Sequence, residues 1–311
     1  MAYRLSLEAP LAENITDILK GEIGRAISVL QTPGHFSKSV HNARKSFKRA
    51  RAALHLARPL MKPKVFKLYD RRIADAARGL SCARDAQVML DAARSLEQAH
   101  RDTGNAALFA HLTSWLLARL EQTRDSEGMI AVDATLTALE NLRDDVAHLP
   151  LGDATFDVLL HSARQTYAQG RAFMREALDS EDDERCHDWR KLVQRHWRHM
   201  TLFQEAWPAE AKARMGLARD LAEVLGEHHD LLVLRAAIFE NAALFPLRRD
   251  VKKLAALIKT RQGDLLAEAA LLGERLFAEK PKAFFRRMGV YWDTAKLVRR
   301  GANAGTLAAR A

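Results

Sequence analysis

Apolar residues recur at spacings of three and four along nearly the whole chain, and this period limits the available folds more than any other feature. Only 15 glycines and 8 prolines interrupt the 311 residues, while alanine and leucine, both strong helix formers, are abundant. The pattern predicts an all-α protein with helices of roughly 15 to 25 residues. Breaks are expected at residues 33–34, 59–63, 103–104, 126–128, 150–152 and 180–184, and at Pro208, Pro246 and Pro281.

A weak internal repeat divides the chain near Pro150. The clearest block is HNARKSFKR at 41–49, which returns as HDWRKLVQR at 187–195, 146 residues later. Two other blocks keep nearly the same offset: Gly24-Arg25-Ala26 with Gly170-Arg171-Ala172, and Asp75, Leu80, Asp85 and Val88 with Asp220, Leu225, Asp230 and Val233. This register predicts one domain over 1–300, made of two equivalent helical bundles, 1–149 and 150–300. Residues 301–311 are expected to form a disordered tail.

Each copy of the repeated block has a cationic face when it is placed on an α-helix. The basic side chains of each copy fall within an arc of about 140°, opposite an apolar face. No carboxylate lies within either arc, although like charges one turn apart repel by about 0.2–0.5 kcal/mol. An external polyanion is the best explanation for such a ridge. The cationic residues are His41, Arg44, Lys45, Lys48 and Arg49 with His55, and His187, Arg190, Lys191, Arg195 and Arg198.

The charge distribution agrees with an anionic partner. The chain carries a net charge of +10, and twelve Lys or Arg side chains against one acid lie between Lys38 and Arg72. Nucleic acid, anionic lipid and a phosphate-rich solute would all suit this charge. Arginine, lysine and protonated histidine all donate hydrogen bonds to phosphate oxygens. Aromatic residues are absent from both arcs, which counts against single-stranded nucleic acid because that ligand normally stacks on aromatic rings.

These blocks resemble the CHAD family, the conserved histidine α-helical domain. The resemblance rests on SVHNARKSFKRARAALHL at 39–56 with LSCARDAQVML at 80–90, and on CHDWRKLVQRHWR at 186–198 with LGEHHDLLVL at 225–234. It implies two four-helix bundles related by a pseudo-twofold axis, and inorganic polyphosphate bound in a basic central pore or groove. The implied ligand contacts are the ten residues His41, Arg44, Lys45, Lys48, Arg49, His187, Arg190, Lys191, Arg195 and Arg198, with Arg25, Arg171, Lys38 and His55 as further candidates.

Two departures from the family pattern concern the second copy. Gln194 stands where a base is expected, and Trp197 interrupts the later part of the stripe, so the second half is expected to make fewer contacts. The triphosphate-tunnel catalytic domain that often accompanies CHAD domains is also not expected here. The chain therefore resembles a stand-alone, non-catalytic binding module without a cofactor.

Several alternatives remain open on the sequence alone. A polyphosphate hydrolase or phosphotransfer protein could use His41 or His187, although phosphoryl transfer normally needs metal ions held by an acidic cluster. Sequence-independent binding of nucleic acid through its backbone is another alternative. Metal binding at Glu97-x-x-His100, Glu184-x-x-His187 or His228-His229 is not expected. Asp85 and Asp230 are expected to cap the helices that follow them, with an ion pair to a motif arginine as the alternative.

The expected location is the cytoplasm, with polyphosphate granules as a candidate site within it. Cys82 and Cys186 fit neither a metal motif nor a disulfide framework, which favours a reducing compartment. No signal peptide and no membrane span are expected, because no stretch of about 18 uninterrupted apolar residues occurs. Chain-length preference, oligomeric state and physiological role cannot be predicted from the sequence.

Overall fold

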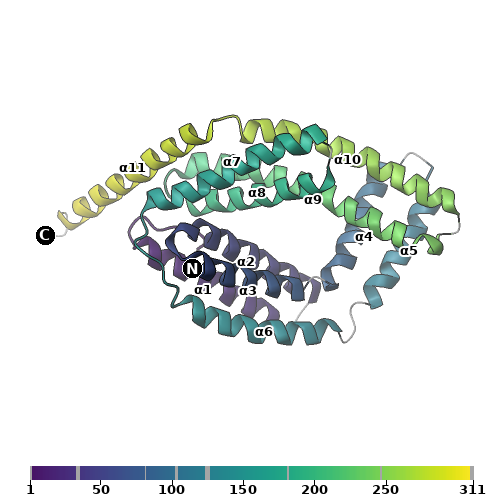
Figure 1. The fold of residues 1–311 in the computed structure, drawn as a ribbon, viewed down its shortest axis with the longest axis horizontal. Coiled ribbons are helices and arrows are strands. Elements are labelled where there is room, and N and C mark those ends of the chain that lie inside the picture. The colour runs from purple at the N-terminus through teal and green to yellow at the C-terminus, as the bar shows by residue number, and fades with distance from the viewer. Residues whose placement is uncertain are drawn as a thin grey trace.

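A computed structural model gives the fold of the protein (Figure 1). It describes residues 2–32, 36–80, 82–101, 104–122, 127–180, 182–245 and 247–308. Within these ranges there are eleven α-helices and no strand, so the prediction of an all-α protein is confirmed. The helices are α1 (Leu11–Gln31), α2 (Phe36–Leu56), α3 (Pro63–Gly79), α4 (Cys82–Ala99), α5 (Ala106–Gln122), α6 (Glu127–Val146), α7 (Phe156–Ser180), α8 (Asp183–Leu202), α9 (Pro208–Glu240), α10 (Arg248–Leu276) and α11 (Pro281–Ala308).

Local sequence signals fix where α8 begins and where α2 ends. The side chain of Asp182 accepts a hydrogen bond from the Glu184 amide at 2.8 Å, and this N-cap starts α8. Helix α2 is followed by a single 3₁₀ turn, Arg58–Leu60, because Pro59 cannot continue an α-helix. Proline is the first residue of α3, α9 and α11, where its missing amide hydrogen has no helical acceptor to lose.

Three helices are longer than the sequence analysis expected. Helix α9 has 33 residues, α10 has 29 and α11 has 28. Because α9 continues through Asp230, the prediction that Asp230 caps a helix is wrong. Residue Asp85 lies inside α4, and its side chain is outside the described residues. Residues 301–311 were expected to be disordered, whereas α11 continues to Ala308, and 309–311 lie outside the described residues.

The helices pack in two groups of four, joined side by side. In the first group, α1 contacts α2 and α6, and α3 contacts α2 and α6. In the second group, α7 contacts α8 and α10, and α9 contacts α8 and α10. Helix α2 is the main link between the groups, because it contacts both α7 and α8. Helix α11 packs on α7 and then runs away from the other helices, so that the C-terminus lies at one extreme of the molecule (Figure 1).

Helices α4 and α5 leave the first group and pack on the second. They lie at the end of the molecule opposite the C-terminus, beside the end of α9 and the start of α10 (Figure 1). Their apolar side chains form a separate core with those two helices, which includes Leu96, Phe109, Leu234 and Ile258. The main core contains residues of both chain halves, among them Phe47 and Trp189 from the motif helices. Neither core is therefore confined to one half of the sequence.

Two glycines of α10 test how closely the second group is packed. A Cβ atom on Gly273 would lie 2.6 Å from Met174 Sδ and 2.8 Å from Trp189 Cζ2, whereas a Cβ atom on Gly263 would meet nothing within 4 Å. We expect Gly273→Ala to destabilise the fold by about 1–3 kcal/mol through overpacking. Gly263→Ala should instead stabilise it by about 1 kcal/mol, because alanine is the better helix former. Urea unfolding of both variants checks the difference, and equal midpoints would contradict it.

A helix that spans a membrane must be both long and predominantly apolar. Within the described part of the chain, every helix is either too short or too polar to traverse a lipid bilayer.

Candidate functional site

The two motif helices, α2 and α8, pack directly against each other near their C-terminal ends. His199 of α8 is fully buried, and its Nε2 donates to the carbonyl oxygen of Ala52 in α2 at 3.1 Å. Ser162 of α7 donates to the carbonyl oxygen of His55 at 2.8 Å. These bonds join the second helix group to α2. The two helices that carry the cationic faces are therefore in contact near their C-terminal ends.

His187 of α8 lies in a cluster of side chains from three helices. Its ring stacks on that of His229 from α9, with ring centroids 4.0 Å apart and planes inclined by 21°. The charges of Lys191 and Arg190 from α8, and of Lys48 from α2, all act on His187. We call Lys48, His187, Arg190, Lys191 and His229 the histidine cluster. It brings side chains from both halves of the chain into one electrostatic environment.

Both rings of the histidine cluster are held neutral. Burial, with the charges of Lys191 and Arg190, lowers the pKa of His187 to about 4. Burial, His187 and Arg190 lower the pKa of His229 to about 3. The Nδ1 atoms of both rings are enclosed and have no hydrogen-bond partner among the residues that the structure describes. The positive charge of the cluster at neutral pH therefore comes from its lysines and its arginine.

Carboxylates lie closer to the second cationic stripe than the sequence analysis expected. Asp188 accepts a hydrogen bond from Lys191 at 2.8 Å, and Asp230 lies 3.9 Å from the guanidinium of Arg190. Asp230 therefore makes the ion pair that was the alternative to capping. Arg190 rests on Gly226 of α9, where a Cβ atom would lie 3.2 Å from Nη2. Glycine at 226 thus leaves room for the arginine to lie flat against α9.

On one side of the contact between α2 and α8, basic residues surround a buried acid. Glu22 of α1 is fully buried, and Arg25 donates to it at 2.8 Å. Arg49 lies 3.8 Å from the same carboxylate and stacks on the ring of Tyr3. Arg198 is only 9% exposed, and burial with the nearby Arg49 lowers its pKa to about 10. Arg25, Arg49 and Arg198 therefore have a structural acid nearby, which the sequence analysis did not identify.

On the other side of the same contact lies a second acid, Asp70 of α3. Arg51 donates to both of its oxygens, at 2.8 and 3.0 Å, and His55 Nε2 donates to it at 3.1 Å. Arg195 Nη2 lies 3.5 Å from His55 Nε2, which is a close approach rather than a hydrogen bond because that nitrogen already donates to Asp70. Burial, with the charge of Arg51, lowers the pKa of Arg195 to about 10, so it stays cationic.

The remaining predicted site residues lie on α2 and α7. Lys38, His41, Lys45 and Lys48 are exposed along α2. Arg44 donates to the carbonyl oxygen of Ala77 in α3 at 2.7 Å, which holds its stem against that helix. Arg171 of α7 acts electrostatically on Tyr167, whose hydroxyl donates to the carbonyl oxygen of Glu279. The structure thus places Arg171 toward α10 and α11.

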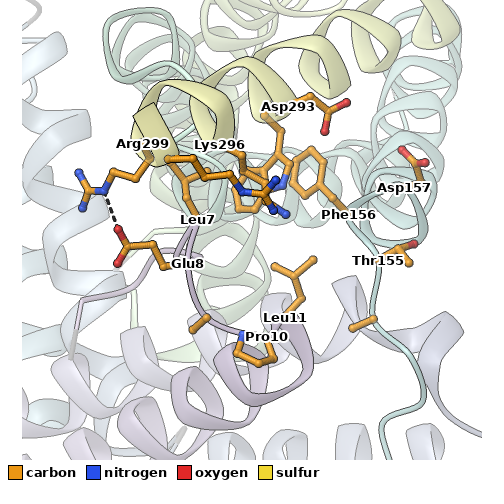
Figure 2. A pocket seen from close by; sticks show the side chains of 14 residues that line it. Leu7, Glu8, Pro10, Leu11, Thr155, Phe156, Asp157, Asp293, Lys296 and Arg299 are labelled. Carbon is orange, nitrogen blue, oxygen red and sulfur yellow. Dashed lines mark hydrogen bonds and ion pairs between the residues drawn. The ribbon is translucent and has the colours of Figure 1, made fainter. Parts of the chain in front are cut away.

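Metal ligands and cavities are the other features of the described residues that bear on function. Among these residues, no three His, Cys, Asp or Glu side chains come together as a metal site. One cavity of about 690 Å³ lies between the N-terminal segment and α11 (Figure 2). Phe156 and Trp292 stack at 4.0 Å in its wall. Its charged residues are evenly balanced between acids and bases, so an anionic polymer gains little there: Glu8, Asp157 and Asp293 against Lys296, Arg299 and Arg300.

Together, these features define an all-α protein in which the two helices that carry the His-x-x-Arg-Lys motif, α2 and α8, pack against each other. The chain belongs to the CHAD domain family, whose model matches residues 28–238. This range runs from the end of α1 to the end of α9 and includes both motif helices. The resemblance inferred from the sequence motifs is therefore confirmed.

The solved structures that resemble this one include PptA and a plant CHAD domain. PptA from Streptomyces chartreusis matches with a TM-score of 0.63 and 17% identity, over 87% of this chain and all of that one. The CHAD domain from the plant Ricinus communis matches with a TM-score of 0.48 and 19% identity, over 87% of this chain and 90% of that one. The first likeness supports the fold. A search of curated proteins finds no match.

His229 is not among the site residues predicted from the sequence. The sequence suggests the His228-His229 pair only as a metal site, and metal binding there is not expected because adjacent helical residues point about 100° apart. The signal was present in the repeat, since His229 takes the place of Arg84 when the two blocks LSCARD and LGEHHD are aligned. A histidine at a position that holds a base in the other half indicates a site residue.

Proposed function

We propose that this chain binds inorganic polyphosphate, without chemical change, in a cationic groove between α2 and α8. The observation that supports this most directly is the histidine cluster, in which Lys48 of one chain half acts on His187 of the other. Like charges from two helices repel each other unless a counter-charge lies between them. A flexible chain of phosphates supplies that charge at close spacing, and each phosphate offers oxygens to lysine, arginine and histidine donors.

The proposed contacts divide by accessibility. Exposed Lys45 and Lys48, with Lys191 and Arg190, would bind phosphate directly, and His41 and Arg44 would extend the track along α2. Arg49, Arg195 and Arg198 lie deeper, beside Glu22 and Asp70, and would contribute mainly their positive field. This ligand would place the protein at polyphosphate granules in the cytoplasm.

We also propose that the two halves form a pseudo-twofold repeat around this groove. The sequence offset pairs α1 with α7 and α2 with α8, and it pairs the broken helices α3 and α4 with the continuous helix α9. The corresponding helices make corresponding contacts, α1 with α2 and α7 with α8. Such a repeat would bring equivalent cationic stripes to one polyanion from two sides.

Titration with medium-chain polyphosphate at two salt concentrations tests this proposal. We expect tight binding at low salt, with log affinity falling against log salt by about 0.7 for each neutralised phosphate. In competition, polyphosphate should displace DNA and RNA of equal charge. Chain length should be unchanged after incubation with Mg²⁺. Preferred binding of nucleic acid would replace the proposal by the nucleic-acid alternative, and shortening of the chains would replace it by the hydrolase.

A further inference from the structure

The stacked pair His187 and His229 is the feature of the site that simple charge attraction leaves unexplained. The two rings lie 4.0 Å apart, at the centre of a group that already holds Lys48, Arg190 and Lys191. Neutral imidazoles contribute no charge to a polyanion site. Their enclosed Nδ1 atoms also make no hydrogen bond within the described part of the chain that would stabilise the fold.

We propose that His187 and His229 form a proton-linked phosphate site, in which the pair takes up one proton when a phosphate chain binds. This inference rests on the proposed function and names a regulator of the same site. A ligand reaches the rings from the Nε2 side, because both Nδ1 atoms are enclosed. The proton adds to Nε2 from solvent, and the resulting imidazolium donates to a phosphoryl oxygen.

The surroundings of the pair explain why the ligand is needed for protonation. On α8, the cations Arg190 and Lys191 disfavour a further positive charge, while Asp188 favours it. From α2, Lys48 disfavours it, and on α9 the neighbouring His228 also acts on His229. Asp230 of α9 lies beside Arg190, and the side chains of residues 82–85 in α4 are outside the described residues. A bound polyanion neutralises the three cations and reverses the balance.

One proton, rather than two, is expected for the pair. Two imidazolium rings at 4.0 Å would repel each other strongly, so the pair titrates as one unit. Protonation of the bound form then occurs at a higher pH than in the free protein, where the pKa of His187 is about 4. Affinity must therefore rise as the pH falls through the pKa of the complex.

The test is the affinity for long-chain polyphosphate between about pH 5 and pH 8 at constant ionic strength. Long chains are used because only the few terminal phosphates titrate near neutral pH. For the wild-type protein we expect affinity to rise by up to about tenfold per pH unit in the acidic part of this range. Calorimetry in buffers of different ionisation enthalpy should detect net proton uptake on binding. Circular dichroism checks that the protein stays folded.

Two variants assign the effect to the pair. The double variant His187→Gln with His229→Gln removes both rings, so its affinity should no longer rise as the pH falls and it should lose most of the proton uptake. His161→Gln removes an exposed histidine of α7 and should keep it. Proton uptake that persists in the double variant, or wild-type binding that is independent of pH, overturns this inference alone. Failure of the wild-type protein to bind at any pH overturns the proposed function as well.

Discussion

Replacing Lys45, Lys48 and Lys191 together by glutamine is expected to weaken polyphosphate binding about a thousandfold at low salt. All three side chains are exposed, on the two helices that the proposed groove separates. A hydrogen bond to a charged group contributes about 1.5 kcal/mol or more, so three such contacts give roughly the stated loss. The salt dependence should flatten in step, by about 0.7 in slope for each contact removed. Fluorescence anisotropy with labelled polyphosphate measures both quantities.

A matched variant separates a site from a general effect of charge. Lys252, Lys253 and Lys259 are exposed on α10, a helix that lies in the second group and has no contact with α2 among its main neighbours. Their replacement by glutamine removes the same three charges from the chain. We expect less than a threefold change in affinity for this control, given the screening of distant charges. Equal losses in the two triple variants would mean that binding follows net charge and not the α2 and α8 surface.

The sequence predicted the helical class and the family because both depend on short-range patterns. Apolar spacing alone identifies an amphipathic helix, and the paired motifs lie within blocks of about a dozen residues. Helix length was predicted less well. Gly216 and Gly226 do not end α9, since packing against the neighbouring helices compensates for their poor propensity. The equivalent segment of the first half breaks between α3 and α4 near Leu80, and no proline marks that break.

The pairing of charges could not be predicted, because it depends on contacts between distant segments. Glu22 lies on α1, far in sequence from Arg198, yet its carboxylate acts on that buried guanidinium. Asp70 likewise meets His55 and the vicinity of Arg195 only once α3 and α8 both flank α2. A helical wheel shows which residues share a face of one helix. It cannot show which acid of another helix lies opposite that face.

The same limit applies to two buried histidines, on which the stability of the fold in acid is expected to depend. His196 and His199 of α8 are fully buried, and sequence analysis placed them with neither the ligand nor the core. Burial, together with Arg214, lowers the pKa of His196 well below its usual value. Burial and Arg195 lower the pKa of His199 to about 3. His196 packs among Tyr167, Phe277 and Phe284, and neither of its ring nitrogens has a hydrogen-bond partner among the described residues.

We therefore expect the fold to lose stability steeply in mild acid. Below about pH 6.5 the unfolded chain protonates both imidazoles, while the folded protein keeps them neutral, so unfolding takes up protons and becomes easier as the pH falls. Two protons give a loss of about 2.7 kcal/mol per pH unit, or about 5 kcal/mol two units lower, which is comparable to the whole stability of many domains. Urea unfolding between neutral pH and about pH 4.5 measures this slope.

Substitutions identify which protons are responsible. The double variant His196→Leu with His199→Gln keeps similar side-chain volumes, and glutamine retains an N–H group for the carbonyl oxygen of Ala52. Its stability should vary with pH by about 2.7 kcal/mol per unit less than that of the wild type below pH 6.5. His161→Gln, which removes an exposed imidazole, should keep the wild-type slope. An unchanged slope in the double variant would mean that His196 and His199 are already protonated in the folded protein, and that the acid sensitivity has another source.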